Sequence, residues 1–550
     1  MLSLPTRKRG MQMNVGSKFY IKVWGYASLA MCAHLSGGGS AGAQDAPEQV
    51  KRGGTLTVAL AVEERFINPA IRASQGVAFI GGKIMEPLME RATGGGVRPV
   101  LATDWSSSPD GLKITVKLRE GVKWHDGKPF TCDDVAFSAI ELWKKRLNFS
   151  TLLQANLQSV QCPTPYTAEF NYSKPMPMSL FVAAMPDLGY PVPKHLYEGT
   201  DIERNEHNNA PVGTGPFKFG EYRRGQYMTV VKNDDYWDKG YPYLDRIVFR
   251  VFNDKSATAA ALESGEILSA DYNAISLGDL PRFKEDKRFI VTGAGSEAQV
   301  TESTIQFNQR NPILKNLNVR KAIYHALNVP LAIDTIFQGH AKLGVGPIPS
   351  TDPNYNTDLP KYEYDPELAK RMLDEAGYPV KADGFRFKLR HRAAPWGEFS
   401  DYWAQFFAQA MGEIGIEVEL VGNDPSAFLQ GVYADHDFDT ANDWHIYRAD
   451  PAISTASWLR SGAPEGAPWT NQLGWKNDKL DAVIDAAAVE VDSKARIDDY
   501  KEMQRIIMEE LPILYPLQHE TTAVESVKLK NDHNNPSWGT SSWYDLWIDQ

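Results

Sequence analysis

The sequence predicts an α/β protein with mixed sheets, divided into two or three lobes. Segments that alternate like strands and segments spaced like helices are interleaved along the whole chain. The 550 residues exceed what one hydrophobic core usually serves. With 43% hydrophobic and 23% charged residues, the composition is that of a globular protein rather than of a disordered or fibrous one.

The first 43 residues have the composition of an export signal. They contain five basic side chains and no acidic one, and the apolar run at residues 23–35 is too short to cross a bilayer. Ala41 and Ala43 place small residues at the two positions that determine cleavage. We therefore expect export and cleavage after Ala43, with a basic amphipathic helix or a retained anchor as the alternative.

A lipoprotein signal is disfavoured because Met31, a bulky residue, stands just before Cys32. Cleavage after Ala43 leaves 53 basic against 69 acidic side chains, a formal charge of −16. This charge repels nucleic acid and anionic lipid, so neither is expected as a partner. No run of 18 apolar residues occurs, and no membrane span is predicted.

The individual elements follow from local patterns. A first strand is predicted at residues 53–60, where apolar and β-branched residues alternate after a glycine pair. A second strand, 114–118, follows the turn residues 108–111. Asp133 and Asp134 precede an apolar run, which suits a helix N-terminus. The same criteria predict strands at 217–222, 228–232, 246–252 and 416–421, and helices at 318–327, 365–376 and 401–414.

Cys132 and Cys162 are the two cysteines that remain after cleavage. Two cysteines in an oxidising compartment often pair, and two buried free thiols are the alternative. We predict the disulfide, which would close a loop of roughly 30 residues and stabilise the fold by about 3 kcal/mol.

Motifs for catalysis, cofactors and metals are incomplete. The nucleophile-elbow pattern at residues 38–42 falls in the export segment, without the strand and helix that it requires. Residues 213–216 lack the third glycine of a dinucleotide fingerprint and predict a turn. Residues 352–363 imitate a calcium loop, but Thr357 stands where glycine is needed. We therefore expect no enzyme, no cofactor and no metal site.

One long block is far more specific than these short motifs. It comprises residues 101–105 (LATDW), 118–131 (LREGVKWHDGKPFT) and 133–138 (DDVAFS). Its spacing of tryptophan, Asp-Gly and Asp-Val resembles the signature of the family-5 extracellular solute-binding proteins, the peptide, nickel and oligosaccharide group. Further segments agree, so the resemblance covers roughly residues 52–548; they are 211–217, 319–328, 364–378 and 477–481.

The resemblance implies a two-lobed periplasmic-binding-protein fold with a closing cleft and an extra domain in the first lobe. After a signal peptide at 1–43, it places lobe I at residues 52–90, 207–300 and 515–550, the extra domain at 91–206 and lobe II at 301–514. Trp105 and Trp124 are expected in the core, and Asp133 or Asp134 as a helix cap.

The implied function is that of a periplasmic receptor without catalysis. It would capture a small polar ligand, either an oligopeptide or an anionic or sugar-like compound, and deliver it to the permease subunits of an ABC importer in the inner membrane. We expect a monomer. The alternative is a periplasmic chaperone or sensor that binds extended polypeptide, and a mainly enzymatic role is a distant third.

Residues 442–451 match the segment that holds an aspartate for the peptide's amino terminus in peptide-binding relatives. The place of that aspartate, three after Trp444, is taken by Tyr447, and Arg448 follows it. A buried ammonium without a carboxylate partner is costly. The exchange therefore favours an anionic or strongly hydrogen-bond-accepting ligand, whereas Asp450 keeps its spacing from Trp444.

Further candidate ligand residues lie in other segments. The resemblance to dipeptide-binding relatives points to Arg392 as a partner of a ligand carboxylate. Trp396 and Trp469 could provide flat walls, with core packing as the alternative. Phe66 and Asn68, after the first strand, are the candidates in the other lobe.

Overall fold

The computed structural model describes residues 50–146, 153–295, 300–531 and 535–549, apart from positions 62, 65, 73, 94, 423 and 449. The chain divides into two compact units, Met1–Gln49 and Val50–Gln550. The predicted export segment, with its cleavage site after Ala43, lies outside the described residues. Among the residues that are described, no helix is long and apolar enough to cross a membrane.

A seven-stranded mixed sheet organises the region that we call lobe I. Its strand order is β12-β19-β11-β1-β10-β9-β8. The central strand β1 runs parallel to β10, whereas β8, β9 and β10 are antiparallel neighbours. The strands are β1 Thr55–Leu60, β8 Phe217–Arg223, β9 Tyr227–Lys232, β10 Arg246–Val251, β11 Ser269–Ala270, β12 Phe289–Thr292 and β19 Ala523–Ser526.

A separate four-stranded antiparallel sheet, β4-β5-β7-β6, lies within the predicted extra domain. Its strands are β4 Ala102–Ser107, β5 Lys113–Leu118, β6 Leu157–Thr164 and β7 Thr167–Tyr172. Helix α2, Cys132–Ser138, contacts β6 and β7. In the structure a disulfide joins Cys132, at the start of α2, to Cys162 in β6, with 5.7 Å between the Cα atoms.

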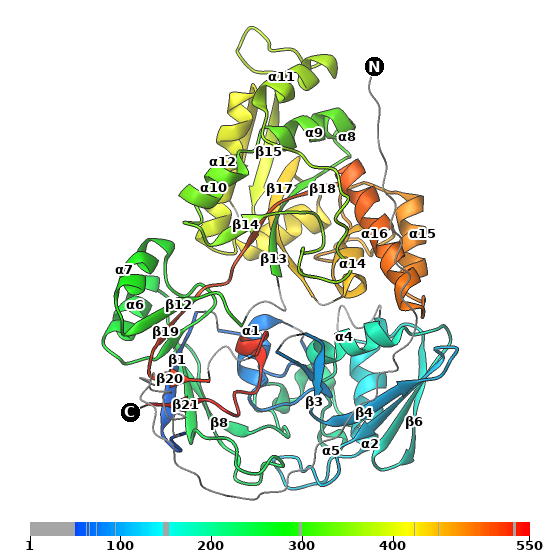
Figure 1. Cartoon of the computed structure of the whole chain (residues 1–550), viewed down its shortest axis with the longest axis vertical. Coiled ribbons are helices and arrows are strands. Elements are labelled where there is room, and N and C mark those ends of the chain that lie inside the picture. Colours follow the sequence, from blue (N-terminus) through cyan, green and yellow to red (C-terminus); the bar gives the residue numbers. More distant parts are fainter. Residues whose placement is uncertain are drawn as a thin grey trace, which may run out of the picture. The chain divides into compact units, whose positions relative to one another are not determined.

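A six-stranded sheet with the order β14-β18-β13-β17-β15-β16 organises the region that we call lobe II (Figure 1). Helix α12 packs against β15, β16 and β17, and α9 packs against α11. The strands are β13 Val300–Phe307, β14 Ala341–Leu343, β15 Phe387–Ala393, β16 Ile416–Val421, β17 Thr440–Tyr447 and β18 Ile513–His519. The helices include α9 Leu317–His325, α10 Val329–Thr335, α11 Pro366–Glu375, α12 Glu398–Glu413, α14 Thr455–Leu459, α15 Asp478–Ala487 and α16 Ser493–Glu510.

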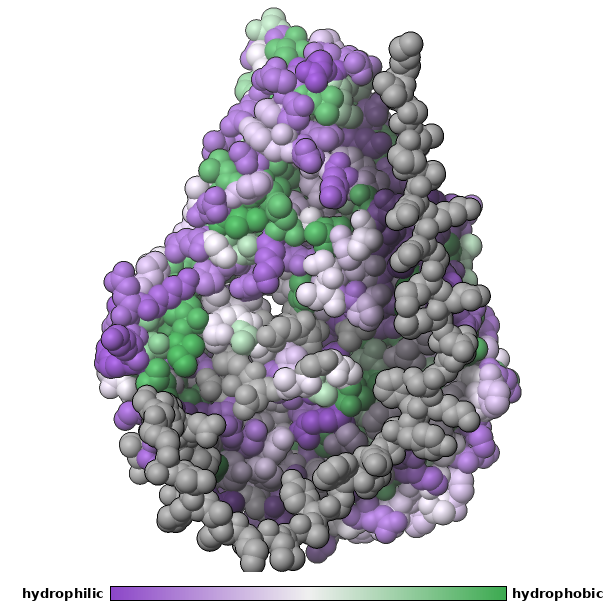
Figure 2. Space-filling model, in the orientation of Figure 1, coloured by the Kyte–Doolittle hydropathy of each residue, from purple (hydrophilic) through white to green (hydrophobic). Residues whose placement is uncertain are grey.

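The remaining described elements fill the connections. In the first half of the chain these are α1 Gln75–Gly81, β2 Met89–Arg91, β3 Val97–Pro99, α4 Met178–Leu188, α5 Lys194–Tyr197, α6 Lys255–Glu263 and α7 Leu280–Glu285. In the second half they are α8 Pro312–Lys315, α13 Pro425–Leu429, β20 Leu529–Lys530 and β21 Trp547–Ile548. Figure 2 shows a largely hydrophilic face with a hydrophobic patch near α10 and β14, where Leu331 and Leu343 are about half exposed.

The chain passes between the two large sheets twice, after β12 and after β18. Strand β18 pairs with β13 and β14 in lobe II. The second passage therefore follows His519, a few residues later than the boundary expected at 515. A direct contact between the lobes lies at the start of α12, where Glu398 accepts hydrogen bonds from Lys255 Nζ at 3.2 Å and Leu277 N at 3.1 Å.

The long sequence block has a structural role. Trp124 is 2% exposed and its indole N–H donates to Asp134 Oδ2 at 3.2 Å. The same carboxylate oxygen accepts from Thr131 N at 3.0 Å and caps α2. Gly213 packs against the chain after α1 so closely that an added Cβ would lie 1.9 Å from Ile84 O. The first contacts lie within the extra domain and the last within lobe I, and the two regions are joined where His125 N donates to Gly213 O at 2.8 Å.

Candidate functional site

The predicted site segment begins in β17, between β13 and β15 of lobe II. Trp444 is half-buried, and its ring meets the ring of buried His519 edge-on, with 4.7 Å between centroids. The Trp444 backbone N–H donates to Asp443 Oδ1 at 2.8 Å. The strand thus fixes the position of this tryptophan.

Asp443 is a fully buried carboxylate that links two of the predicted tryptophans. It accepts hydrogen bonds from Trp396 Nε1 and Tyr433 OH, each at 2.8 Å. Burial raises the pKa of Asp443 to about 6, against the lowering effect of these hydrogen bonds. Trp396 is half-buried and also packs edge-on against Phe428. Asp443 therefore holds the indole of Trp396, whereas it contacts Trp444 only through the backbone N–H of that residue.

Tyr447 is buried at the end of β17, and its hydroxyl lies beside the carboxylate of Asp352. Burial and the nearby Asp352 and Asp450 charges raise the pKa of Tyr447 well above its usual value. Burial also raises the pKa of Asp352. Asp352, which belongs to a loop distant in sequence, thus lies near Tyr447. No spacing in the sequence indicates this approach.

Asp450 forms a buried ion pair with Arg496 of α16. Arg496 Nη1 and Nη2 lie 2.7 and 2.9 Å from the two carboxylate oxygens, and both side chains are 3% exposed. Tyr500 OH and Ala452 N also donate to Asp450 Oδ1. Arg496 Nη1 reaches Ser179 Oγ of helix α4 at 3.2 Å. This pairing favours a structural role for Asp450, with its segment held against α4.

Arg448, between Tyr447 and Asp450, faces charged groups of α4 and β2. Burial lowers the pKa of Arg448, and the nearby Asp187 carboxylate raises it while Arg91 lowers it. Arg91 Nη2 pairs with Asp187 Oδ2 at 2.5 Å, and the two side chains are 6% and 10% exposed. The Arg91–Asp187 pair therefore lies close enough to Arg448 to influence its pKa.

The other predicted candidates lie in different surroundings. Arg392 in β15 donates to Asp437 O at 2.6 Å and Asp437 Oδ2 at 2.7 Å. Asn68 is buried and donates to Tyr197 OH at 2.8 Å, while its Oδ1 accepts from Ala70 N at 2.9 Å. These contacts favour structural roles for Arg392 and Asn68.

The two remaining candidates, Trp469 and Phe66, are half-buried. Trp469 has a left-handed backbone, with φ of +58°, and its backbone N–H hydrogen-bonds to the buried Tyr433. Through Tyr433 it belongs to the network around Asp443. Phe66 follows β1 in lobe I. No group of three or more His, Cys, Asp or Glu side chains suited to a metal occurs among the described residues.

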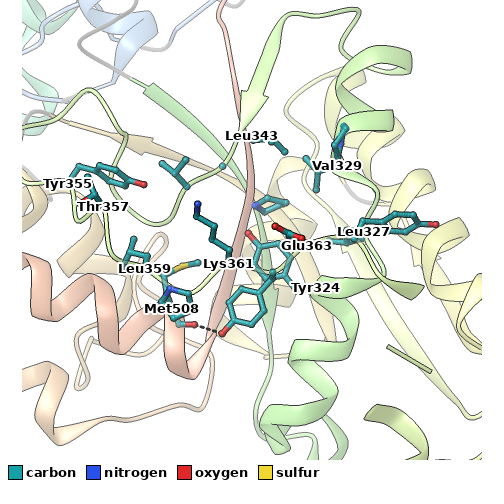
Figure 3. A pocket seen from close by; sticks show the side chains of 17 residues that line it. Tyr324, Leu327, Val329, Leu343, Tyr355, Thr357, Leu359, Lys361, Glu363 and Met508 are labelled. Atoms are coloured by element: carbon teal, nitrogen blue, oxygen red, sulfur yellow. Dashed lines mark hydrogen bonds between the residues drawn. The ribbon is translucent and has the colours of Figure 1, made fainter. Parts of the chain in front are cut away.

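A cavity of about 410 Å³ lies within lobe II, and none of these residues lines it. Figure 3 shows Lys361 pointing toward its middle, with Leu359 and Met508 on one side and Leu327 and Val329 on the other. The rings of Tyr324 and Tyr362 stack at 5.1 Å, and Tyr362 OH donates to Met508 O at 2.8 Å. The imitated calcium loop forms part of this wall, through Thr357 and Glu363.

Comparisons with known proteins agree on one family. The model for bacterial extracellular solute-binding proteins, family 5 Middle, matches residues 96–466. The oligopeptide-binding protein AppA of Bacillus subtilis is 27% identical over 490 residues, which cover 85% of this chain and 87% of that protein. The glutathione-binding protein GsiB of Salmonella paratyphi A is 26% identical, covering 81% and 85%.

Solved structures of similar proteins share the fold. The periplasmic binding protein DppA of Helicobacter pylori in complex with peptide STSA is 26% identical and covers 91% of this chain and 99% of its own, with a TM-score of 0.77. NikZ of Campylobacter jejuni, in complex with Ni(L-His), covers 87% and 95% at 24% identity, also with a TM-score of 0.77.

Proposed function

Since the chain belongs to the bacterial extracellular solute-binding proteins, family 5, we propose that it captures a small polar ligand between its two lobes and delivers it to an ABC-type importer. The relatives are named for binding oligopeptides and glutathione, which favours a transport receptor over a chaperone or sensor. The ligand is an oligopeptide or an anionic or sugar-like compound. The protein acts as a monomer, without catalysis, and its partners are the importer's permease subunits.

The arrangement of residues 444–450 is the observation that carries this proposal. In one short segment Trp444 N donates to Asp443, Tyr447 lies near Asp352, and Asp450 pairs with Arg496, which reaches Ser179 of α4 in the extra domain. Such a segment can hold a ligand in lobe II while contacting the extra domain. Ligand that favours this arrangement stabilises the closed state, which the transporter can distinguish from the open state.

The site of action is the periplasm, with the signal peptide removed after Ala43. Family membership supports export, because the family is extracellular. The basic start, the short apolar run and the Ala-Gly-Ala sequence support this cleavage position.

Mass spectrometry of compounds released from denatured, freshly purified protein tests the proposal. A transport receptor should release one small molecule or a narrow set of related ones. Release of heterogeneous polypeptide would contradict it in favour of a chaperone. If the purified protein carries nothing, exposure to yeast extract followed by washing should load it, and failure to retain any compound would contradict ligand capture.

A further inference from the structure

The cavity of about 410 Å³ in lobe II is lined by none of the residues proposed to bind the transported ligand. Its wall includes α9, the start of α10, the segment after β14, and residues 355–364. Pockets for small molecules typically have volumes of about 300–1,000 Å³. A cavity of about 150 Å³ is already large enough to hold benzene. The cavity in lobe II is therefore large enough for a small organic molecule.

Hydrogen bonds hold the loop that forms one wall of the cavity. Asn356 N donates to Gln504 Oε1 at 3.0 Å, and both belong to the contact between this loop and α16. Asn356 Nδ2 donates to Lys501 O of the same helix at 3.1 Å. Further along the loop, His325 Nδ1 of α9 donates to Glu363 O at 2.7 Å. The loop is thus attached to two helices, so its wall is formed before any ligand enters.

Most of the cavity surface is apolar. The hydroxyl groups of two tyrosines in the wall are already bonded to the backbone. Tyr324 OH donates to Tyr515 O at 3.1 Å. Tyr362 OH donates to Met508 O at 2.8 Å. Leu343 is 52% exposed, so an apolar group placed beside it would remove apolar surface from water. The aliphatic and thioether side chains in the wall are Leu327, Val329, Leu343, Leu359 and Met508.

Two opposite charges line this apolar cavity without pairing with each other. Lys361 points toward the middle of the cavity, and Glu363 lies two residues further along the same wall (Figure 3). Within the part of the chain that the structure describes, neither side chain forms an ion pair. An ammonium group and a carboxylate in one cavity are complementary to a ligand that carries both opposite charges.

We infer that this cavity binds a free amino acid with a large apolar side chain. The carboxylate of the amino acid pairs with Lys361, and its ammonium group pairs with Glu363. Its side chain lies among the apolar residues of the wall. This site is additional to the ligand site proposed around residues 444–450, and it does not depend on that site.

The two charges select a zwitterion over ligands with one charge or none. A molecule with only an amino group would be repelled by Lys361, and one with only a carboxylate would be repelled by Glu363. A phosphate carries about −1.5 to −2 at neutral pH, which exceeds what one lysine balances. An uncharged molecule would cover both charged groups and give neither a partner, which is unfavourable.

Calorimetry with the purified protein and four probes tests this inference. L-phenylalanine carries both charges and an apolar side chain. N-acetyl-L-phenylalanine lacks the ammonium group, L-phenylalaninamide lacks the carboxylate, and L-serine lacks the apolar side chain. We expect L-phenylalanine to bind, and each of the other probes to bind at least about fivefold more weakly. Each loses either one ion pair or the burial of the ring.

Two variants test the charged residues. Lys361→Met and Glu363→Gln should each weaken binding of L-phenylalanine at least about fivefold. Lys361→Met should also bind L-phenylalanine and its amide about equally, because the partner of the carboxylate is gone. Lys370→Met and Glu367→Gln are the matched controls. These two residues pair on the surface of α11, with side chains 39% and 70% exposed, and their variants should bind L-phenylalanine as the original protein does.

Several results would overturn the inference. They are no binding of L-phenylalanine up to about 10 mM, equal binding of all four probes, or binding by both cavity variants within about twofold of the original protein. Binding of N-acetyl-L-phenylalanine as tightly as L-phenylalanine would also overturn it, in favour of a simple carboxylate site. None of these results bears on capture of the transported ligand, which is measured separately. Circular dichroism checks the fold of each variant, and the four probes on the original protein decide where a variant does not fold.

Discussion

Replacing Asp450 by alanine should strongly destabilise the protein. Its carboxylate accepts from Arg496 Nη1 at 2.7 Å, from Nη2 at 2.9 Å, and from Tyr500 OH at 2.8 Å. Both members of the ion pair are 3% exposed. The substitution leaves a buried guanidinium without its carboxylate, which typically costs about 3–5 kcal/mol. Bulk solvent cannot replace the carboxylate where both side chains are this deeply buried.

Urea unfolding followed by tryptophan fluorescence measures this loss. Glu509→Ala is the control. Glu509 pairs with Arg505 on the surface of α16, the helix that also carries Arg496, and their side chains are 47% and 37% exposed. A surface pair contributes about 0–1 kcal/mol. The double variant Asp450→Leu with Arg496→Met removes both buried charges together. It should recover most of the loss, because an apolar replacement of a buried pair is often close to neutral.

A loss for Asp450→Ala within about 0.5 kcal/mol of the Glu509→Ala loss would refute this reasoning. It would mean that Asp450 remains solvated when the lobes are free in solution. A double variant as unstable as Asp450→Ala would refute the second step, since shape rather than charge would then dominate the contact.

Three further predictions concern other parts of the chain. Burial raises the pKa of Glu86 from 4.5 to about 7, so the stability from its bound proton is full below pH 4.5 and is lost as the pH rises through 7. Glu86→Gln should remove up to about 3 kcal/mol of this pH dependence in urea unfolding between about pH 5 and 8, and an unchanged slope would contradict the assignment. Thiol titration under denaturing, non-reducing conditions should find Cys132 and Cys162 unreactive, and replacing both by serine should cost about 3 kcal/mol; two free thiols would exclude the disulfide. Small-angle scattering should show a smaller radius of gyration with the retained compound bound, and no change would count against lobe closure.

Local patterns predicted much of the fold. The strand expected at 416–421 is β16, Ile416–Val421, and the helix expected at 318–327 is α9, Leu317–His325. Helix α12 begins at Glu398, three residues before the expected start, because Gly397 with φ of +118° turns the chain into it. The sequence patterns do not predict strand β18. It is entirely buried between β13 and β14, so its side chains show no alternation between core and solvent.

The candidate site could be predicted only along one segment. Trp444, Tyr447 and Arg448 are predicted because the spacing within residues 442–451 resembles that of relatives, and their role in binding stays a prediction. Their partners Asp352 and Asp187 are distant in sequence and belong to no periodic pattern. Only the folded chain brings such residues together. The sequence can indicate the charge of a residue that neighbours Tyr447 or Arg448. The position of that residue depends on how β17 and α4 are placed in the fold.

The position of β19 has a consequence for how the chain acquires its fold as it is synthesised. Strand β12 pairs with β19, Ala523–Ser526, which also pairs with β11. Residues 289–292 are therefore synthesised more than two hundred residues before their partner strand β19. Until the last part of the chain has left the ribosome, the sheet of lobe I cannot close. Strands β1, β8, β9, β10 and β11 can pair earlier, so it is the β12–β19 edge of this sheet that is completed last.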